Sequence, residues 1–258
     1  MENKLTSTVT ALAQQPWTHI VWDWNGTLKD DFDDLLGATN ATLTLLGAVP
    51  VDDVTYRALH CVPIPEFYRL VLGRLLTVDE QAAAEGKFTR YPSRRPVRLR
   101  DGAAALLADL RDSGHTQSLQ SLLPHERLMA ETAEAGVSDL FDRIDGRHRP
   151  GGTKAEALAA HLIHQPGHSR GVLLIGDTSD DAHPARAVGA RAVLVTGGLE
   201  EPASLHRTGT AVGDNLHQPP HAARPRAGQQ QGRKTGTRCA GSAHRPRTGD
   251  LSPLRRTR

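Results

Sequence analysis

Two kinds of hydrophobic pattern alternate along the chain up to residue 196. Short runs of Val, Leu and Ile that end in polar residues predict buried parallel strands, and apolar residues that recur every three or four positions predict helices. The runs predict strands at residues 18–22, 115–121, 141–144, 171–175 and 190–196. The periodic segments predict helices at residues 31–46, 63–72, 101–111, 124–135, 153–162 and 181–188, and a capping box of Thr77 and Glu80 opens another.

The order of these elements predicts an α/β fold. Strands that alternate with helices form a doubly wound parallel sheet with helices on both faces. Residues 31–94 depart from that order because only helices are predicted there. We therefore expect a helical cap at 31–94, inserted into a Rossmann-like core made of residues 1–30 and 95–216.

Charge is divided unevenly along the chain, although the net value is only +2. Residues 217–258 hold ten Lys or Arg, one Asp, five Pro and five Gly, with Leu251 and Leu254 as the large aliphatic residues. Such a segment cannot bury enough apolar surface to offset its ordering entropy, so we expect a disordered basic tail. The tail lacks aromatic residues for base stacking, which disfavours nucleic acid as a partner. Its composition also fits out-of-frame translation of a GC-rich gene.

Cysteine content and hydropathy exclude several classes of protein. Two cysteines, Cys61 and Cys239, leave no disulfide framework and no multi-cysteine zinc site. No apolar run reaches the ~20 residues that cross a bilayer, and the N-terminus lacks the pattern of a signal peptide. We expect a soluble, cytoplasmic protein with no membrane partner.

Polar side chains with complementary chemistry follow three of the predicted strands. Ligands of an open parallel sheet bind beyond the carboxyl ends of its strands. Those ends carry Asp23, Ser121 and the acidic segment 176–181, and Lys154 begins the helix before the last of them. Carboxylates suit Mg²⁺, whereas a hydroxyl and an ammonium suit phosphoryl oxygens. The turn after Asp23, with Gly26, exposes backbone N–H groups that can hold an anion.

These segments resemble the motifs of a known family. Residues 21–30, Val-Trp-Asp-Trp-Asn-Gly-Thr-Leu-Lys-Asp, resemble the first motif of the haloacid dehalogenase superfamily, and residues 172–181 resemble its fourth, Gly-Asp-x-x-x-Asp. Gly114 followed by Ser121 is similar to the second motif, and Lys154 suits the third. The predicted cap corresponds to the cap of phosphoglycolate-phosphatase-like members.

The resemblance, which covers residues 17–198, implies a Mg²⁺-dependent phosphohydrolase that acts on a small phosphorylated metabolite. Asp23 would attack phosphorus and form an aspartyl-phosphate. The implied Mg²⁺ ligands are Asp23, the backbone carbonyl of Asn25, Asp177 and Asp181. The implied phosphoryl-binding residues are Gly26, Thr27, Ser121 and Lys154, of which Ser121 and Lys154 also assist catalysis.

One position departs from the family pattern. Two residues after the nucleophile the family usually has Asp, a general acid for the leaving alcohol and then a base for water, whereas this chain has Asn25. An amide cannot carry a proton, and loss of general acid–base catalysis costs roughly 10²–10⁴ in rate. We therefore expect slow hydrolysis of alkyl phosphates and better hydrolysis of activated aryl or acyl phosphates.

Asn25 also keeps two other functions open. A catalytically weak or inactive relative would bind a phosphorylated ligand or a protein partner. Carbon–halogen hydrolysis is a lesser alternative, because the acidic pair Asp177 and Asp181 indicates a cation, on which that branch does not depend. The residues leave the substrate and the oligomeric state open.

Histidines form a second pattern near the third motif. His161, His164 and His168 have the spacing of metal ligands, but no carboxylate lies near them in the sequence to complete a set. The sequence therefore disfavours a metal site there. In the predicted cap, His60, Phe67 and Tyr68 are placed where substrates would be discriminated, with core packing as the expected role of Phe67.

Overall fold

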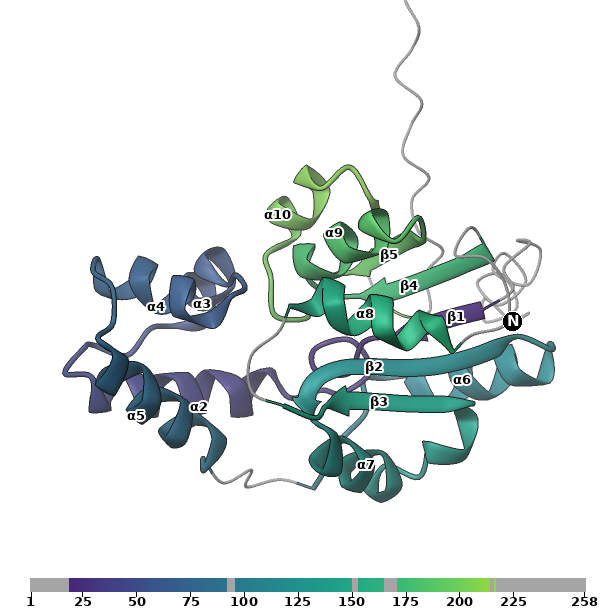
Figure 1. The fold of residues 1–258 in the computed structure, drawn as a ribbon, viewed down its shortest axis with the longest axis horizontal. Coiled ribbons are helices and arrows are strands. Elements are labelled where there is room, and N and C mark those ends of the chain that lie inside the picture. The colour runs from purple at the N-terminus through teal and green to yellow at the C-terminus, as the bar shows by residue number, and fades with distance from the viewer. Residues whose placement is uncertain (1–18, 92–95, 150–152, 165–170, 214–215, 217–258) are drawn as a thin grey trace, which may run out of the picture. The chain divides into compact units, whose positions relative to one another are not determined.

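The computed structural model describes residues 19–91, 96–149, 153–164, 171–213 and 216. The predicted basic tail at 217–258 lies outside these residues. Within them a six-stranded parallel sheet has the order β3-β2-β1-β4-β5-β6 (Figure 1). Its strands are β1 (His19–Trp22), β2 (Thr116–Pro124), β3 (Arg143–Arg147), β4 (Val172–Gly176), β5 (Arg191–Val195) and β6 (Ala211–Gly213). The order reverses direction at β1, which confirms the predicted doubly wound sheet.

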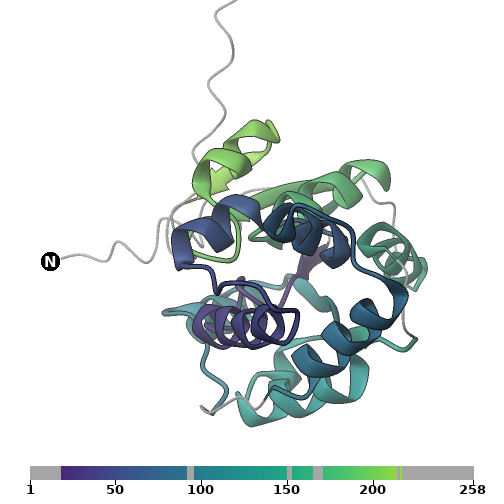
Figure 2. The same cartoon turned by 90° about the vertical axis from the view of Figure 1, so that its left-hand side faces the viewer.

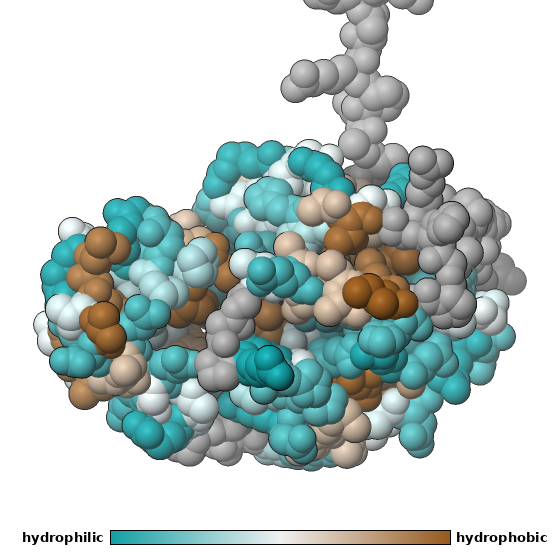
Figure 3. Space-filling view, viewed as in Figure 1, coloured by the Kyte–Doolittle hydropathy of each residue, from teal (hydrophilic) through white to brown (hydrophobic). Residues whose placement is uncertain are grey.

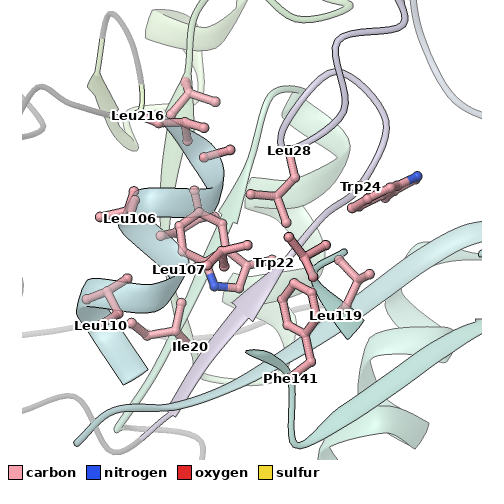
Figure 4. Close-up of a cluster of buried hydrophobic side chains, with 14 of the residues drawn as sticks. Ile20, Trp22, Trp24, Leu28, Leu106, Leu107, Leu110, Leu119, Phe141 and Leu216 are labelled. Carbon is pink, nitrogen blue, oxygen red and sulfur yellow. The ribbon is translucent and has the colours of Figure 1, made fainter. Parts of the chain in front are cut away.

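Helices cover both faces of this sheet. Successive side chains of β1 point to opposite faces, so β1 contributes to the apolar core on each side. On one face Ile20 and Trp22 pack against Leu107 of α6 (Ala103–Asp112), in the cluster drawn in Figure 4. On the other face Val21 packs with Leu158 of α8. The remaining core elements are α7 (His125–Glu134), η1 (Ser138–Leu140), α8 (Lys154–Ile163), α9 (Ser179–Ala187) and α10 (Pro202–Arg207).

Four helices between β1 and α6 have a core of their own. They are α2 (Phe32–Leu45), α3 (Asp53–Leu59), α4 (Ile64–Leu72) and α5 (Val78–Thr89), drawn in purple to blue in Figures 1 and 2. Leu43, Tyr56, Phe67 and Tyr68 are buried together among them, and Leu199 of the α/β core joins this cluster. The separate cluster supports our proposal that residues 31–94 form a cap domain, and it gives Phe67 the expected packing role.

The cap also exposes most of the large apolar side chains on the described surface. Figure 3 shows brown, hydrophobic surface over these helices at the left of the view. The exposed side chains of this region are Leu45, Val49, Val54, Ile64, Leu70, Leu75 and Val78. None of the described helices is long and apolar enough to cross a membrane.

Some predicted boundaries were wrong. β2 does not end at Ser121 but continues to Pro124, and its pairing with β3 becomes irregular between Gln120 and Pro124. α9 begins at Ser179 rather than Asp181, because Thr178 and Asp181 form a capping box that starts the helix. The sequence pattern missed α3, η1, α10 and β6, which are all seven residues or shorter and carry weak periodicity.

Candidate active site

Three buried carboxylates meet where β1 and β4 end. Asp23 follows β1, and its backbone N–H donates to the carbonyl of Ile175 in β4 at 2.9 Å. Asp177 follows β4, and Asp181 lies in the first turn of α9. The ligand oxygens of Asp23, Asp177 and Asp181 all lie within 4.8 Å of one another. The parallel sheet therefore brings Asp23 beside Asp177, which lies 154 positions further along the sequence.

Lys154, the first residue of α8, reaches this cluster from the side. Its Nζ lies 2.7 Å from Asp23 Oδ1 and 2.6 Å from Asp181 Oδ1, and the ammonium is buried. Burial alone would lower the pKa of Lys154, but the charges of Asp181 and Asp23 hold that pKa above its usual value. The structure thus gives Lys154 a permanent positive charge beside Asp23.

Hydrogen bonds from neighbouring protein groups orient Asp177 and Asp181. The Thr27 hydroxyl donates to Asp177 Oδ1 at 2.8 Å, and the backbone N–H of Leu199 donates to Asp177 Oδ2 at 2.6 Å. The backbone N–H and the hydroxyl of Thr178 both donate to Asp181 Oδ2, at 3.1 and 2.8 Å. Directional contacts of this kind fix the carboxylates before any ligand is bound.

Glycines make room for these carboxylates. A Cβ atom on Gly198 would lie 2.1 Å from Asp177 Oδ2, and one on Gly26 would lie 2.3 Å from the same oxygen. Gly26 also adopts a φ of 72°, which favours glycine. A Cβ atom on Gly176 would lie 2.0 Å from Asp181 Cγ. Any side chain at these positions would displace a carboxylate.

The electrostatics of the cluster fit a divalent cation. Burial, together with the charges of Asp23 and Asp181, raises the pKa of Asp177 to about 8. Burial also raises the pKa of Asp23 to about 6, against the opposing effect of Lys154. Asp181 Oδ1 is buried, and apart from its 2.6 Å ion pair with Lys154 it has no partner among the described residues. Oxygen ligands with an unused lone pair and unbalanced negative charge are what Mg²⁺ requires.

Asn25 is part of a second buried network that the sequence analysis missed. Its side-chain amide donates to Asp31 Oδ2, and the backbone N–H of Gly26 donates to Asp31 Oδ1 at 3.1 Å. The Nζ of Lys29 lies 3.4 Å from Asp31 and 2.8 Å from Glu131. The amide of Asn25 is therefore engaged with the protein itself. The run Lys29-Asp30-Asp31 was the available signal, but charged residues beside a motif are usually solvent-exposed.

Arg100 is a further residue of the site that no motif in the sequence indicated. Its Nη1 donates to the carbonyl of Gly26 at 2.8 Å, and its Nη2 donates to the carbonyl of Thr196 at 2.6 Å. The guanidinium thus joins the turn after β1 to the loop after β5. Both loops carry groups that contact Asp177.

The second-motif residue is less closely tied to the cluster. Trp22 pairs with Leu119 across β1 and β2, so Ser121 lies two residues beyond the last paired residue, at the same rim as Asp23. Ser121 is buried, and its hydroxyl accepts from the backbone N–H of Leu123 at 3.1 Å. Its contact with a phosphoryl group stays a prediction, as does the Mg²⁺ ligation by the Asn25 carbonyl.

The cap places two basic side chains near the site. The guanidinium of Arg57 lies 3.5 Å over the ring centre of Phe32, and its buried Nη1 has no hydrogen-bond partner among the described residues. The carbonyl of Arg57 accepts from the backbone N–H of Glu201 at 3.2 Å. Burial and the positive charge of Lys154 lower the pKa of His60 to about 4. Burial lowers the pKa of Arg57 and the charges of Asp53 and Asp177 oppose that change, so both side chains experience the charges of the core site.

Comparison with known proteins identifies the family. The family model described as HAD-hyrolase-like matches residues 150–219 of the sequence. A phosphoglycolate phosphatase of Cereibacter sphaeroides is 30% identical over 191 residues, which are 69% of this chain and 85% of that protein. The chain belongs to the haloacid dehalogenase superfamily. It is a phosphatase-type hydrolase of the phosphoglycolate-phosphatase-like branch of that superfamily.

Two further similarities bear on this haloacid dehalogenase chain. A haloacid dehalogenase-like hydrolase of Streptococcus pneumoniae superposes with a TM-score of 0.67 at 22% identity, over 76% of this chain and 93% of that one. The tyrosine-protein kinase PtkA of Mycobacterium tuberculosis is 27% identical over 202 residues, which are 75% of this chain and 67% of that protein. Its solved structure superposes with a TM-score of 0.58 at 26% identity, over 72% of this chain and 86% of that one.

Proposed function

We propose that this protein is a Mg²⁺-dependent phosphohydrolase that acts on a small phosphorylated metabolite through an aspartyl-phosphate. The observation that carries the proposal is the convergence of Asp23, Asp177 and Asp181 with the buried ammonium of Lys154. The phosphoglycolate phosphatase relatives support a phosphorylated small molecule as the substrate.

In this proposal Asp23 is the nucleophile. One of its oxygens forms a bond to phosphorus as the ester P–O bond breaks, and water then breaks the acyl-phosphate bond. A carboxylate and a phosphate dianion repel each other, so Lys154 neutralises the phosphoryl oxygens, with the hydroxyl of Ser121 as a further donor. The backbone N–H of Gly26 and the hydroxyl of Thr27, which we expected to bind the phosphoryl group, instead donate to Asp31 and Asp177. Mg²⁺ held by Asp23, Asn25, Asp177 and Asp181 would supply Lewis-acid stabilisation of the transferred group.

Asn25 narrows the substrates that we propose. The leaving oxygen of an alkyl phosphate needs a proton, and the amide of Asn25, which already donates to Asp31, has none to give. A phenolate or a carboxylate leaves without protonation, so activated phosphates are the preferred class. Arg57 and His60 of the cap are the residues through which we expect substrates to be selected.

A second candidate function is phosphoryl transfer to an acceptor other than water. The similarity to the tyrosine-protein kinase PtkA favours it. The acceptor hydroxyl would take the phosphoryl group from Asp23 and release its proton to solvent.

Turnover of p-nitrophenyl phosphate by the full chain, with Mg²⁺ and with EDTA, tests the proposal. Asp23→Asn should reduce kcat by about 10⁴-fold because it removes the nucleophile. Asp30→Asn is the matched control, since Asp30 is exposed and pairs with Arg98, and it should retain wild-type turnover. Turnover that survives EDTA and Asp23→Asn would rule the proposal out. Mg²⁺-dependent binding of inorganic phosphate without any turnover would favour a catalytically inactive binding protein.

A further inference from the structure

A chain of hydrogen-bonded side chains lies beneath the sheet-facing side of α8, away from the carboxylates. His161 Nδ1 lies 2.7 Å from Asp145 Oδ2, and His161 Nε2 lies 2.6 Å from the hydroxyl of Ser118. The same hydroxyl lies 2.6 Å from His19 Nε2, and His19 Nδ1 lies 2.8 Å from the hydroxyl of Thr116. These residues come from α8 and three adjacent strands, so the chain links the helix to the sheet.

Burial lowers the pKa of His19 and of His161, and with both rings neutral the carboxylate of Asp145 sets the direction of each hydrogen bond in this network. Asp145 accepts, so His161 Nδ1–H donates, and the bare Nε2 of neutral His161 accepts from the hydroxyl of Ser118. Ser118 in turn accepts from His19 Nε2–H, and His19 Nδ1 accepts from Thr116. Every group in this network then has a partner, and Asp145 Oδ2 accepts a second hydrogen bond from Arg143 Nε. A sequence reading that sought a carboxylate near His161 along the chain could not find Asp145, because the fold supplies it.

The geometry of Ser118, His161 and Asp145 is that of a serine nucleophile, its base and an orienting acid. Ser118 is fully buried, however, and lies within β2 between two paired strands. No substrate can reach such a hydroxyl. The arrangement must therefore act within the protein.

The hydrogen-bonded network joins α8 at His161, and Lys154 lies on the same helix. Lys154, Leu158 and His161 are spaced four and three residues apart and share the helix face that meets the sheet. Across from them His19, Val21 and Asp23 alternate along β1 on one face. Lys154 contacts Asp23, Leu158 packs with Val21, and His161 connects to His19 through Ser118. Helix and strand are thus matched over about 10 Å of helix.

Only the two ends of this match are directional. Apolar packing of Leu158 tolerates sliding of the helix, whereas a hydrogen bond weakens steeply with distance and angle. Lys154 holds one end, and it must also serve the phosphoryl group. At the other end of the match, His161 makes the directional contacts, through its hydrogen bonds to Asp145 and Ser118.

We propose that His161 is a positioning residue for Lys154: its hydrogen bonds to Ser118 and Asp145 set the register of α8 on β1 and so hold the Lys154 ammonium beside Asp23. This inference rests on the proposed role of Lys154 in holding phosphoryl oxygens. It assigns catalytic importance to a buried histidine seven residues away from the site on the same helix.

Replacement of His161 by Leu tests the inference, with His164→Leu as the matched control. His164 is exposed at the end of α8. In His161→Leu we expect kcat for p-nitrophenyl phosphate to fall between about ten- and a hundredfold, the cost of a displacement near 1 Å, with a weaker change in KM. His161→Gln keeps one donor and one acceptor and should recover much of the loss. His164→Leu should match the wild type.

A double-mutant cycle separates positioning from general destabilisation. If His161 acts through Lys154, His161→Leu should cost nothing further in kcat when Lys154→Met is already present. Equal losses in both backgrounds, measured on folded protein, would overturn the inference. Where His161→Leu does not fold, Ser118→Ala replaces it, since it removes the link and keeps the ring.

A readout that needs no turnover distinguishes failure of this inference from failure of the proposed function. The ¹⁵Nζ resonance of Lys154, assigned by its loss in Lys154→Met, reports the ammonium directly. We expect that resonance to shift in His161→Leu or Ser118→Ala and to stay in place in His164→Leu. An unchanged resonance overturns the inference even if the enzyme is active, and a shifted one upholds it even if no phosphate ester is hydrolysed.

Discussion

The side-chain amide of Asn25 donates a hydrogen bond to the carboxylate of Asp31, six residues further along the chain. The position two residues after Asp23, where the resemblance leads us to expect a proton-transferring Asp, is thus occupied by an amide whose partner is itself a buried acid. Asp31 also accepts from the backbone N–H of Gly26 and pairs with Lys29, so the amide is held in one orientation. Rate and leaving-group preference should both depend on this pair.

Exchanging the members of this pair tests that dependence. Asn25→Asp alone places two carboxylates side by side, whereas Asn25→Asp with Asp31→Asn restores one acid and one amide. We expect the double variant to hydrolyse an alkyl phosphate about 10²-fold faster than the wild type, because a general acid is then present. The single variant should gain less and melt at a lower temperature. Equal wild-type rates for p-nitrophenyl phosphate and an alkyl phosphate would contradict the premise.

Mg²⁺ should stabilise the folded protein through the three carboxylates. Without the cation these groups repel one another, so thermal denaturation in EDTA should occur at a lower temperature than in millimolar Mg²⁺. Asp177→Asn should melt higher than the wild type in EDTA and lose the response to Mg²⁺, since it removes one ligand and a buried acid that is costly to ionise beside Asp23 and Asp181. Asp180→Asn, next in the helix but outside the cluster, should keep the response. A Mg²⁺ effect that persists in Asp177→Asn would argue against this site.

Gly198 should be intolerant of even a methyl group. A Cβ there would overlap Asp177 Oδ2, which the backbone N–H of Leu199 holds in place. We expect Gly198→Ala to weaken the Mg²⁺ dependence of activity by tenfold or more, roughly the effect of disturbing a metal ligand. Gly86→Ala, in α5, meets only the flexible end of Arg90 and should raise stability by about 1 kcal/mol. Unaltered activation by Mg²⁺ in Gly198→Ala would contradict the proposed geometry.

Both hydrogen bonds of the Arg100 guanidinium should be required for full stability and activity. Lys at this position offers one compact ammonium, so Arg100→Lys leaves the carbonyl of Gly26 or that of Thr196 without its partner. We expect a loss of about 1–3 kcal/mol in the free energy of unfolding by urea, together with a lower kcat. Arg98→Lys, two residues earlier, changes an exposed pair with Asp30 and should have little effect. If Arg100→Lys and Arg98→Lys had similar free energies of unfolding and similar kcat values, Arg100 would not be joining the two loops.

Acid should destabilise the protein through His19. Burial is the main cause that lowers the pKa of His19 to about 4; His161 acts in the same direction and Asp142 in the opposite one. The folded state therefore binds fewer protons than the unfolded state between pH 4 and about 6.5, so the stabilisation is complete above that range and is lost as the pH falls. The slope reaches at most about 1.4 kcal/mol per pH unit, and His19→Gln should reduce it. Urea unfolding at neutral and acidic pH measures this slope in the wild type and in His19→Gln. An identical pH dependence in the two proteins would exclude the contribution of His19.

The sequence by itself determined the sheet and much of the site. The apolar runs of β1 and β4 predict buried parallel strands, and parallel strands bring their carboxyl ends to one rim, so Asp23, Asp177 and Asp181 could be placed together. Lys154 could be placed at the start of a helix beside them. These inferences depend on periodicity and strand direction, which are local properties of the chain.

Only the tertiary structure decided the contacts that orient these groups. Arg100 joins two loops from a segment without a pattern, and Asp31 engages Asn25 through the curvature of a turn. Asp145 supplies His161 with the carboxylate that its neighbours in sequence lack. Such contacts connect residues 6 to 150 positions apart, as between Asn25 and Asp31 or Thr27 and Asp177. Hydrogen bonds and ion pairs act over a few ångströms, and the distances that matter to them exist only after the chain has folded.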